Sequence, residues 1–283
     1  MPSESAGWLW LIHGDARRLT GLESRSVHLV VTSPPYPMIP QWDRLFEQLG
    51  AATYEEMHRA LEPAWRECYR LLVPGGLLAV NIGDALRGGP EGFQLWPNHA
   101  ATLAAAQRIG FVPLPYLLWK KPTNKPNAFL GSGFLPPNAY VTLDCEYILL
   151  FRKGSLRRFA PHDPRRRASQ LTRSERDRWF TQIWTDIRGQ RQTSGDRRTG
   201  AFPPEIPRRL VRMFSVEGDT VVDPFAGTGT TLWEAVRLGR SAIGIERDPA
   251  AFRALRRTQR SLGLTGPPVA ARAAAGPGSR SRR

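Results

Sequence analysis

A glycine-rich loop between an apolar strand and a helix, with a second strand that ends in an acid, constrains this chain most. An apolar run at residues 220–222 leads into Gly227-x-Gly229, and the next apolar run, at residues 241–245, ends at Glu246. Glycines at such a turn let the backbone pass close to a ligand above the helix N-terminus, and the acid can accept hydrogen bonds from ribose hydroxyls. Because no Gly-Lys-Ser/Thr follows, a Walker loop is excluded. The pattern predicts a nucleoside site in an α/β fold.

Short apolar runs alternate with amphipathic stretches along most of the chain. We expect strands at residues 8–13, 27–31, 77–82, 114–119, 146–152, 220–222 and 241–245. We expect helices at residues 54–72, 94–108, 203–215, 231–238 and 249–262. Pro74-Gly75-Gly76 is expected to end the first helix, and Phe252, Leu255 and Leu262 to share one side of the last. This alternation predicts an open, mostly parallel sheet with helices on both faces and ligands at the carboxyl ends of its strands.

A second loop, Thr32-Ser33-Pro34-Pro35-Tyr36, directly follows the apolar run at residues 27–31. Its prolines restrict φ and remove competing donors, so the Ser33 side chain and the Pro34 carbonyl can accept both hydrogens of an amine. Such contacts favour a pyramidal nitrogen, which an exocyclic base amine lacks because its lone pair is delocalised into the ring. Tyr36 offers a face on which an extruded base can stack. The loop suits methyl transfer to a base amine, a reaction that needs no covalent intermediate.

Together the two loops resemble those of the DNA amino-methyltransferases, in which Asp223-Pro224-Phe225-Ala226-Gly227-Thr228-Gly229-Thr230-Thr231 matches the loop for S-adenosylmethionine. The catalytic loop comes first here, so the resemblance is to the permuted, beta-type N4-cytosine/N6-adenine family. It extends over residues 10–262 and fails over residues 154–199. It implies a Rossmann-like S-adenosylmethionine-dependent methyltransferase fold, circularly permuted, with a small basic target-recognition insert.

The resemblance also implies roles for single residues. The acid matching Glu246 holds the ribose, the acid matching Asp15 faces the adenine amine, and the segment that begins at Phe202 closes over the methionine portion. Asp15 is alternatively a helix N-cap. The residues expected to be catalytic are Ser33, Pro34, Pro35 and Tyr36. The residues expected to bind the cofactor are Asp15, Thr32, Phe202, Asp223, Pro224, Phe225, Ala226, Gly227, Thr228, Gly229, Thr230 and Glu246.

The first residue of the proline loop bears on the target base. The family uses Ser-Pro-Pro-Tyr mostly for cytosine N4 and Asp- or Asn-Pro-Pro-Tyr mostly for adenine N6, so Ser33 points to cytosine N4. Cytosine C5 methylation is excluded because it needs a Pro-Cys pair, whereas Glu67 precedes Cys68 and Asp144 precedes Cys145. Neither cysteine has a second Cys or a His at ligand spacing, so we expect no disulfide framework and no metal.

Positive charge is concentrated in one segment. The chain has 40 Lys and Arg against 25 Asp and Glu, a formal net charge of +15. Residues 152–198 alone hold 14 of these cations against five acids, with Trp179, Phe180 and Trp184 among them. A solvated face usually mixes both signs, so this segment predicts contact with double-stranded DNA. The expected DNA-binding residues are Lys120, Lys121, Arg157, Arg158, Arg165, Arg166, Arg167, Arg173 and Arg191.

These features divide the chain into four parts. Residues 1–152 form the catalytic half, 153–199 the basic target-recognition insert, 200–263 the cofactor-binding half and 264–283 a disordered basic tail. No apolar run is long enough to span a membrane and no signal peptide is evident, so we expect a cytoplasmic enzyme that is nucleoid-associated through DNA.

The function expected from these parts is site-specific DNA methylation at cytosine N4. The alternatives are adenine N6 methylation, an RNA-base or protein-glutamine methyltransferase, and a non-catalytic DNA-binding module. A homodimer and a partner restriction endonuclease for the same site are left open.

Overall fold

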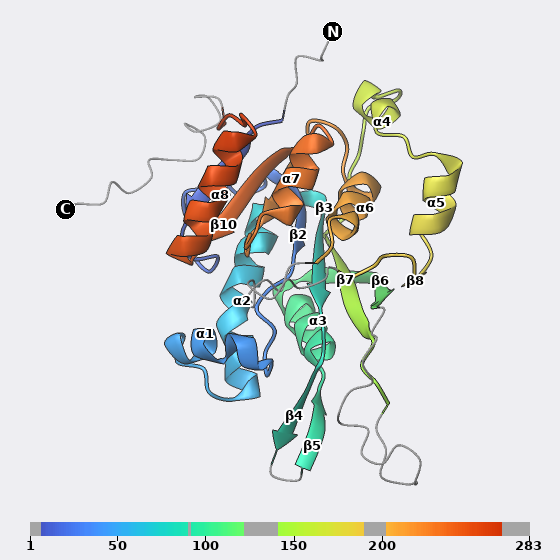
Figure 1. Ribbon diagram of the computed structural model, residues 1–283. Helices are drawn as coiled ribbons and strands as arrows, with labels where there is room; N and C mark the ends of the chain where they lie inside the picture. The colour runs from blue at the N-terminus through green and yellow to red at the C-terminus, as the bar shows by residue number, and fades with distance from the viewer. Residues whose placement is uncertain (1–6, 90–91, 122–140, 190–201, 268–283) are drawn as a thin grey trace, which may run out of the picture.

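An eight-stranded sheet forms the centre of the computed structural model, which describes residues 7–89, 92–121, 141–189 and 202–267 (Figure 1). The strand order is β1 (Leu9–His13), β10 (Ser241–Glu246), β9 (Thr220–Asp223), β2 (Val27–Thr32), β3 (Leu72–Ile82), β7 (Cys145–Lys153), β6 (Phe111–Lys120) and β8 (Ile183–Trp184). All neighbours pair in parallel except that β7 is antiparallel to β3 and β6. The predicted open and mostly parallel sheet is confirmed.

The central strands are apolar along nearly their whole length because helices cover both faces of the sheet. On one face, α2 (Tyr54–Leu71) and α3 (Asn98–Ile109) pack with β2 and β3 around Trp65 and Phe151. On the other face, α6 (Glu205–Phe214), α7 (Thr230–Arg237) and α8 (Pro249–Ser261) pack around Leu29 and Leu210. Strands buried on both faces become continuous apolar runs, which is the pattern that the sequence shows.

Strand β2 lies between β3 and β9, and this position interleaves the two halves of the chain. Leu29 pairs with Val221 on one side and with Leu77 on the other. The parallel strands β2 and β9 therefore end at the same edge of the sheet, although nearly two hundred residues separate them in sequence. The two sequence loops, which follow β2 and β9, are brought to that edge.

Several smaller elements accompany this sheet. A short 3₁₀ helix, Pro40–Trp42, and α1 (Asp43–Gln48) follow the proline loop. The hairpin of β4 (Ala85–Gly89) and β5 (Gly92–Trp96) projects away from the main body in Figure 1. The basic segment forms α4 (Pro164–Ala168), α5 (Arg173–Trp179) and β8, and Figure 1 shows α4 and α5 set apart on the side of α6.

Several expected boundaries are wrong, most clearly around β5 and β3. Residues 94–96 belong to β5 rather than to a helix, because they pair with β4, and α3 starts only after Pro97. Helix α2 ends at Leu71, and Pro74-Gly75-Gly76 lies inside β3. Gly75 is needed there because a Cβ atom would lie 2.2 Å from the backbone nitrogen of Arg157.

The C-terminal end of the described chain also differs from expectation. Leu262 is exposed and does not share the buried side of α8 with Leu255. The Leu9 backbone N–H donates to the Thr265 carbonyl at 2.9 Å, and Pro267 is buried, so the packed chain continues past Leu264. The rest of the expected tail, residues 268–283, lies outside the described residues. No described helix has the length and apolar character needed to cross a bilayer.

Candidate functional site

The glycine-rich loop and the acid after β10 meet directly. The Glu246 carboxylate accepts hydrogen bonds from the backbone N–H of Gly227 at 2.8 Å and of Asp248 at 2.7 Å. Gly227 and Thr228 are exposed, and Gly227 adopts a φ of +52°. Burial raises the pKa of Glu246, while the backbone hydrogen bonds from Asp248 and Gly227 act in the opposite direction. The arrangement presents an open stretch of backbone beside a carboxylate, as a nucleoside site requires.

A buried aspartate connects the two loops. Asp223 ends β9 and accepts hydrogen bonds from the Thr32 hydroxyl at 2.7 Å and from the Phe225 backbone N–H at 3.1 Å. Thr32 ends β2 and is fully buried, so its hydroxyl joins the loops rather than lining an open surface. Burial raises the pKa of Asp223 to about 6 despite these hydrogen bonds. The structure thus brings the proline loop and the glycine loop side by side.

The remaining residues that are expected to bind the cofactor differ in their exposure to solvent. Asp223, Pro224, Ala226 and Gly229 are buried, whereas Phe225 and Thr230 are partly exposed and Thr228 is exposed. Phe202 is buried with the apolar side chains of the α6 face. The exposed groups of this loop are therefore the backbone around Gly227 and the side chains of Thr228 and, in part, Thr230, whereas the Phe225 ring packs against Trp65.

Asp15 lies next to this site, because the Gly14 backbone N–H donates to the Glu246 carbonyl at 3.0 Å. Its carboxylate accepts from the Arg17 backbone N–H at 2.9 Å and from the Arg17 guanidinium at 2.7 Å. Burial opposes ionisation of Asp15, but the hydrogen bonds and charge of Arg17 outweigh it and hold the pKa below its usual value. The residues directly after Asp15 form turns and not a helix, so the alternative of a helix N-cap is wrong.

The proline loop contains a chain of side-chain hydrogen bonds that sequence reasoning did not anticipate. The Ser33 hydroxyl lies 3.0 Å from the Tyr36 hydroxyl, which lies 3.2 Å from Glu146 Oε2. The Asn81 amide nitrogen donates to Tyr36 at 2.8 Å and to Glu146 at 2.6 Å. Pro34 and Pro35 are buried, whereas Ser33 and Tyr36 are partly exposed. Burial of its hydroxyl and the charge of Glu146 raise the pKa of Tyr36 well above its usual value.

Asn81 and Glu146 are the functional candidates that the sequence analysis missed. Both are polar residues within apolar strands, Asn81 near the end of β3 and Glu146 near the start of the antiparallel β7, and both are buried. A buried polar residue in an apolar run was the available signal, because such a group needs partners. A third such residue is Asn98, which is fully buried and donates to the Pro37 and Gly83 carbonyls at 2.9 and 3.0 Å. It holds the exit of the proline loop against the end of β3.

The expected DNA-binding cations fall into paired and free groups. Arg157 forms a two-pronged contact with the buried Asp219, at 2.5 and 2.7 Å, and Lys121 pairs with Glu146 beneath the proline loop. The weaker contacts at the surface involve Lys120 with Asp144, Arg165 with Asp163, Arg167 with His162, and Arg173 with Asp177. Arg158 and Arg166 are exposed and have no ion pair with any described residue. Arg191 lies outside the described residues.

The aromatic residues of the basic segment also fall into two groups, buried and exposed. Trp179 and Trp184 are buried and lie against the Arg209 guanidinium, with ring centres 5.8 and 5.1 Å from its central carbon. Trp184 belongs to the apolar core on the α6 face and both rings are buried, so the expectation that these two rings contribute to a nucleic-acid surface is wrong. Phe180 is 53% exposed. Aromatic residues next to arginine in sequence therefore serve two purposes here, packing and surface exposure.

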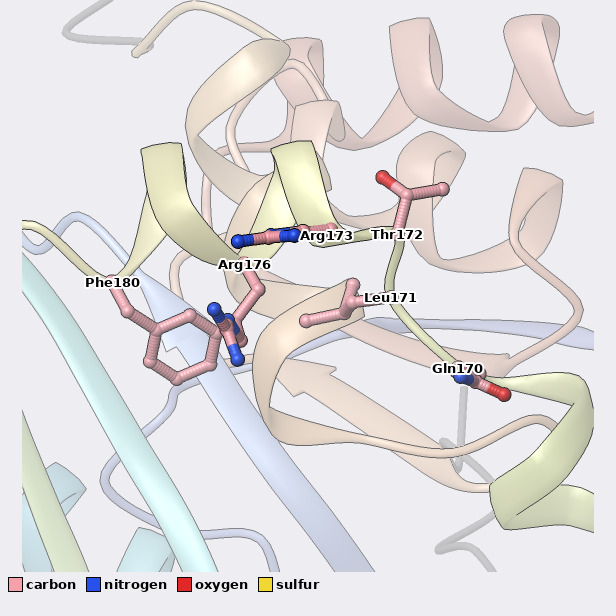
Figure 2. A pocket seen from close by; sticks show the side chains of 6 residues that line it. All are labelled: Gln170, Leu171, Thr172, Arg173, Arg176 and Phe180. Carbon is pink, nitrogen blue, oxygen red and sulfur yellow. The ribbon is translucent and has the colours of Figure 1, made fainter.

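An open pocket of about 620 Å³ lies on the basic segment, away from both loops (Figure 2). It is lined by Gln170, Leu171, Thr172, Arg173, Arg176 and Phe180. Two arginines and an exposed aromatic ring are the side chains that bind phosphates and stack on bases. The described residues contain no group of three or more His, Cys, Asp or Glu side chains that could hold a metal ion.

Comparison with known proteins identifies close similarity over most of the chain. Residues 27–257 match the DNA methylase family of N6 and N4 methyltransferases. The type II methyltransferase M.MjaI of Methanocaldococcus jannaschii is 56% identical over 263 residues, covering 84% of this chain and 86% of that protein. The type II methyltransferase M.MthZI of Methanothermobacter thermautotrophicus is 45% identical over 246 residues, covering 80% of this chain and 69% of that protein.

Two solved structures are similar in fold. A putative DNA modification methylase from Thermus thermophilus, complexed with S-adenosyl-L-methionine, is 38% identical with a TM-score of 0.72, covering 90% of this chain and 96% of that chain. The PvuII DNA methyltransferase, described as cytosine-N4-specific, is 18% identical with a TM-score of 0.65, covering 89% of this chain and 86% of that chain. The second likeness extends to the fold alone.

Proposed function

Because this chain belongs to the DNA methylase family of N6 and N4 methyltransferases, we propose that it methylates the exocyclic N4 amine of a flipped cytosine in duplex DNA. The family makes it an S-adenosylmethionine-dependent DNA methyltransferase with a Rossmann-like fold. The choice of cytosine N4 is the further step. The observation that carries it is Ser33, because the family uses Ser-Pro-Pro-Tyr mostly for that amine.

The residues around the glycine loop fit the cofactor. The exposed backbone at Gly227 and Thr228 can approach a nucleoside, and Glu246 keeps free lone pairs beside its two backbone contacts. We assign the ribose hydroxyls to Glu246 and the adenine amine to Asp15. The cofactor supplies an electrophilic methyl group on a sulfonium ion. The protein's task is to hold that methyl group in line with the amine of the target base.

The proline loop prepares the amine for attack. Ser33 and the Pro34 carbonyl accept its two hydrogens and localise the nitrogen lone pair, while the Tyr36 ring stacks on the base. The amine nitrogen would then attack the methyl carbon that bound S-adenosylmethionine supplies, the electron pair of the broken carbon–sulfur bond would stay on sulfur, and one amine proton would pass to solvent so that the base leaves neutral. The buried prolines support this role because they limit motion of the loop.

The basic segment supplies the DNA surface in this proposal. Residues 153–199 act as the target-recognition insert between the catalytic half, residues 1–152, and the cofactor half, residues 200–263. Arg158, Arg166 and Arg173 are exposed and suited to phosphates or guanine edges. The pocket with Arg173, Arg176 and Phe180 gives the insert a concave surface for the same partner (Figure 2).

The activity is tested by incubating the purified protein with duplex DNA and S-adenosylmethionine labelled in the methyl group. We expect label in the DNA, recovered as N4-methylcytosine after digestion to nucleosides. Recovery as N6-methyladenine would refute the proposed base, and the absence of label in DNA would refute the activity. Modified-base sequencing of DNA from cells that express the protein then identifies the methylated site.

The division of roles is tested with two substitutions. Tyr36→Ala removes the stacking face, so we expect base capture to fall while cofactor affinity stays within about twofold. Glu246→Ala removes the ribose acceptor and the tether of Gly227, so cofactor affinity should fall by about 10-fold or more. Isothermal titration with cofactor measures one effect, and fluorescence of 2-aminopurine at the target position measures the other. Equal loss of cofactor affinity in both variants would contradict the assignment.

A further inference from the structure

Ser33 carries a hydroxyl, which can either donate or accept a hydrogen bond. Such a group has one hydrogen and two lone pairs, and its hydrogen rotates toward the best acceptor. The choice matters at a base pocket, because cytosine presents an amine where uracil and thymine present a carbonyl oxygen. A hydroxyl that is free to rotate can satisfy either group. Its surroundings decide whether Ser33 has that freedom.

The groups beyond Tyr36 have fixed hydrogen-bonding directions. The Glu146 carboxylate and the Asn81 backbone carbonyl only accept, and both lie 3.2 Å from the Tyr36 hydroxyl oxygen. The Asn81 amide nitrogen only donates, and it lies 2.8 Å from the same oxygen. The reverse orientation of that amide would place its oxygen against the Glu146 carboxylate at 2.6 Å, which electrostatic repulsion disfavours.

These directions determine where the hydroxyl hydrogen of Tyr36 points. The phenol has one hydrogen, and it keeps that hydrogen at neutral pH because burial and Glu146 raise its pKa. If Tyr36 donated to Ser33, its lone pairs would face a carboxylate and a carbonyl with no hydrogen between them. Asn81 and Glu146 are buried, so water does not relieve that contact. Tyr36 therefore donates inward, and Ser33, 3.0 Å away, donates to Tyr36.

We propose that Tyr36, Asn81 and Glu146 make Ser33 an acceptor only, so that the pocket admits an exocyclic amine and rejects a carbonyl at the same position. The inference rests on the proposed function, because it needs Ser33 to face the target base. It holds for cytosine against uracil or thymine, and equally for adenine against hypoxanthine. Asn81 and Glu146 act through Tyr36 and are positioning residues. Lys121 pairs with the Glu146 carboxylate from the other side.

The test compares an amine with a carbonyl at the target position. Two duplexes carry the methylated site and differ only in cytosine or uracil there, each opposite an abasic position so that the cost of flipping is similar. If the methylated base proves to be adenine, the pair is adenine and hypoxanthine. Binding of the full-length protein is measured with S-adenosylhomocysteine present, which prevents turnover. We expect wild-type protein to prefer the amine by about 10- to 100-fold, because a carbonyl would leave two acceptors facing each other.

Tyr36→Phe is the decisive variant, because it keeps the stacking ring and removes the oxygen to which Ser33 donates. The freed hydroxyl can then donate to uracil, so we expect the preference to fall at least about threefold, the Pro34 carbonyl still disfavouring uracil, while cofactor affinity is unchanged and thermal stability falls only slightly because one buried hydrogen-bond partner is lost. Tyr69→Phe is the matched control. Tyr69 of α2 packs against Phe111 of β6, and loss of its hydroxyl should leave the preference intact. An unchanged preference in Tyr36→Phe, or no preference in wild-type protein, would overturn the inference.

Ser33→Ala separates this inference from the function on which it rests. If Ser33 contacts the amine, this variant should lose methyl transfer in a single turnover by about 10-fold or more while it still binds cofactor. Full methyl transfer by Ser33→Ala would refute the catalytic role of Ser33, and the inference with it. Loss of methyl transfer together with an unchanged preference in Tyr36→Phe would refute the inference alone.

Discussion

Single buried polar residues join the two loops of this enzyme. Asp223 accepts from Thr32 and from the Phe225 backbone, so one carboxylate holds the end of β2 against the start of the cofactor loop. The same burial makes its charged form costly, and its pKa rises to about 6. Asn81 and Glu146 act similarly beneath the proline loop. Burial of each of these groups costs desolvation free energy, and the hydrogen bonds that it makes fix the position of a neighbouring residue.

Asp223 should make the stability of the protein depend on pH in a defined direction. Its pKa is about 6 when folded and near 3.8 when unfolded, so the folded state binds the proton more tightly. Stability relative to Asp223→Asn should therefore rise as pH falls through 6. We expect the difference in unfolding free energy to favour wild type by about 1 kcal/mol more at pH 5 than at pH 8. Urea denaturation at both pH values measures it, and a difference that does not change with pH would contradict the assignment.

At the scale of elements, a buried arginine attaches the basic segment to the rest of the fold. Arg209 of α6 is 1% exposed and donates to both oxygens of Asp186, at 3.0 and 2.8 Å, and to Glu205 at 2.8 Å. Hydrogen bonds from Arg209 lower the pKa of Asp186 to about 2, although partial burial opposes this. Trp179 of α5 and Trp184 of β8 cover the guanidinium. Arg209 is therefore one of the residues of the cofactor half that hold the insert, together with Asp219 and Arg212.

Loss of the Asp186 carboxylate should weaken the attachment of this segment. Asp186→Ala leaves the Arg209 guanidinium buried with a single acid, and we expect a loss of about 2–4 kcal/mol in unfolding free energy at pH 7. Asp177→Ala is the control, because Asp177 pairs only with exposed arginines and should cost less than about 1 kcal/mol. Because the folded pKa of Asp186 is depressed, its contribution is present above about pH 4 and is lost as pH falls toward 2. Equal losses in the two variants would contradict the anchoring role.

At the scale of the whole molecule, the net charge of +15 is not all available to DNA. Arg157 is committed to Asp219, whose side chain is fully buried, and its backbone crosses β3 at Gly75. Its neighbour Arg158 is exposed and makes no ion pair with a described residue. Two adjacent arginines of the same segment therefore have different tasks, one in the fold and one at the surface.

This difference predicts opposite phenotypes for two neighbouring substitutions. Arg157→Ala removes the arginine that pairs with the buried Asp219 carboxylate, so we expect a loss of about 3 kcal/mol in unfolding free energy. Arg158→Ala should leave stability unchanged, weaken DNA binding at all sequences, and lower the slope of log affinity against log salt by about 1. Chemical denaturation and a salt titration of DNA binding separate the two effects. A stable Arg157→Ala variant, or an unaltered salt slope in Arg158→Ala, would show that the assignments are wrong.

Much of the fold and the outline of the site could be predicted from sequence because their signals are local. The apolar runs at β2, β9 and β10 and the glycines between β9 and α7 depend on neighbours within a few residues. The same local reasoning failed at residues 94–96, where pairing with β4 outweighed helical spacing. It also failed at Trp179 and Trp184, because proximity to arginine in sequence does not show which side of the chain is buried.

The sequence by itself determined most strands of the central sheet, the two loops and the acid after β10, since each depends on short-range periodicity and turn chemistry. Only the tertiary structure decided what the loops contact, because those partners are distant along the chain. Thr32 meets Asp223 only because β2 lies beside β9, and Tyr36 meets Glu146 only because β7 pairs with β3. Burial at these contacts determines which cations are free, which carboxylates are hard to ionise and in which direction Ser33 donates.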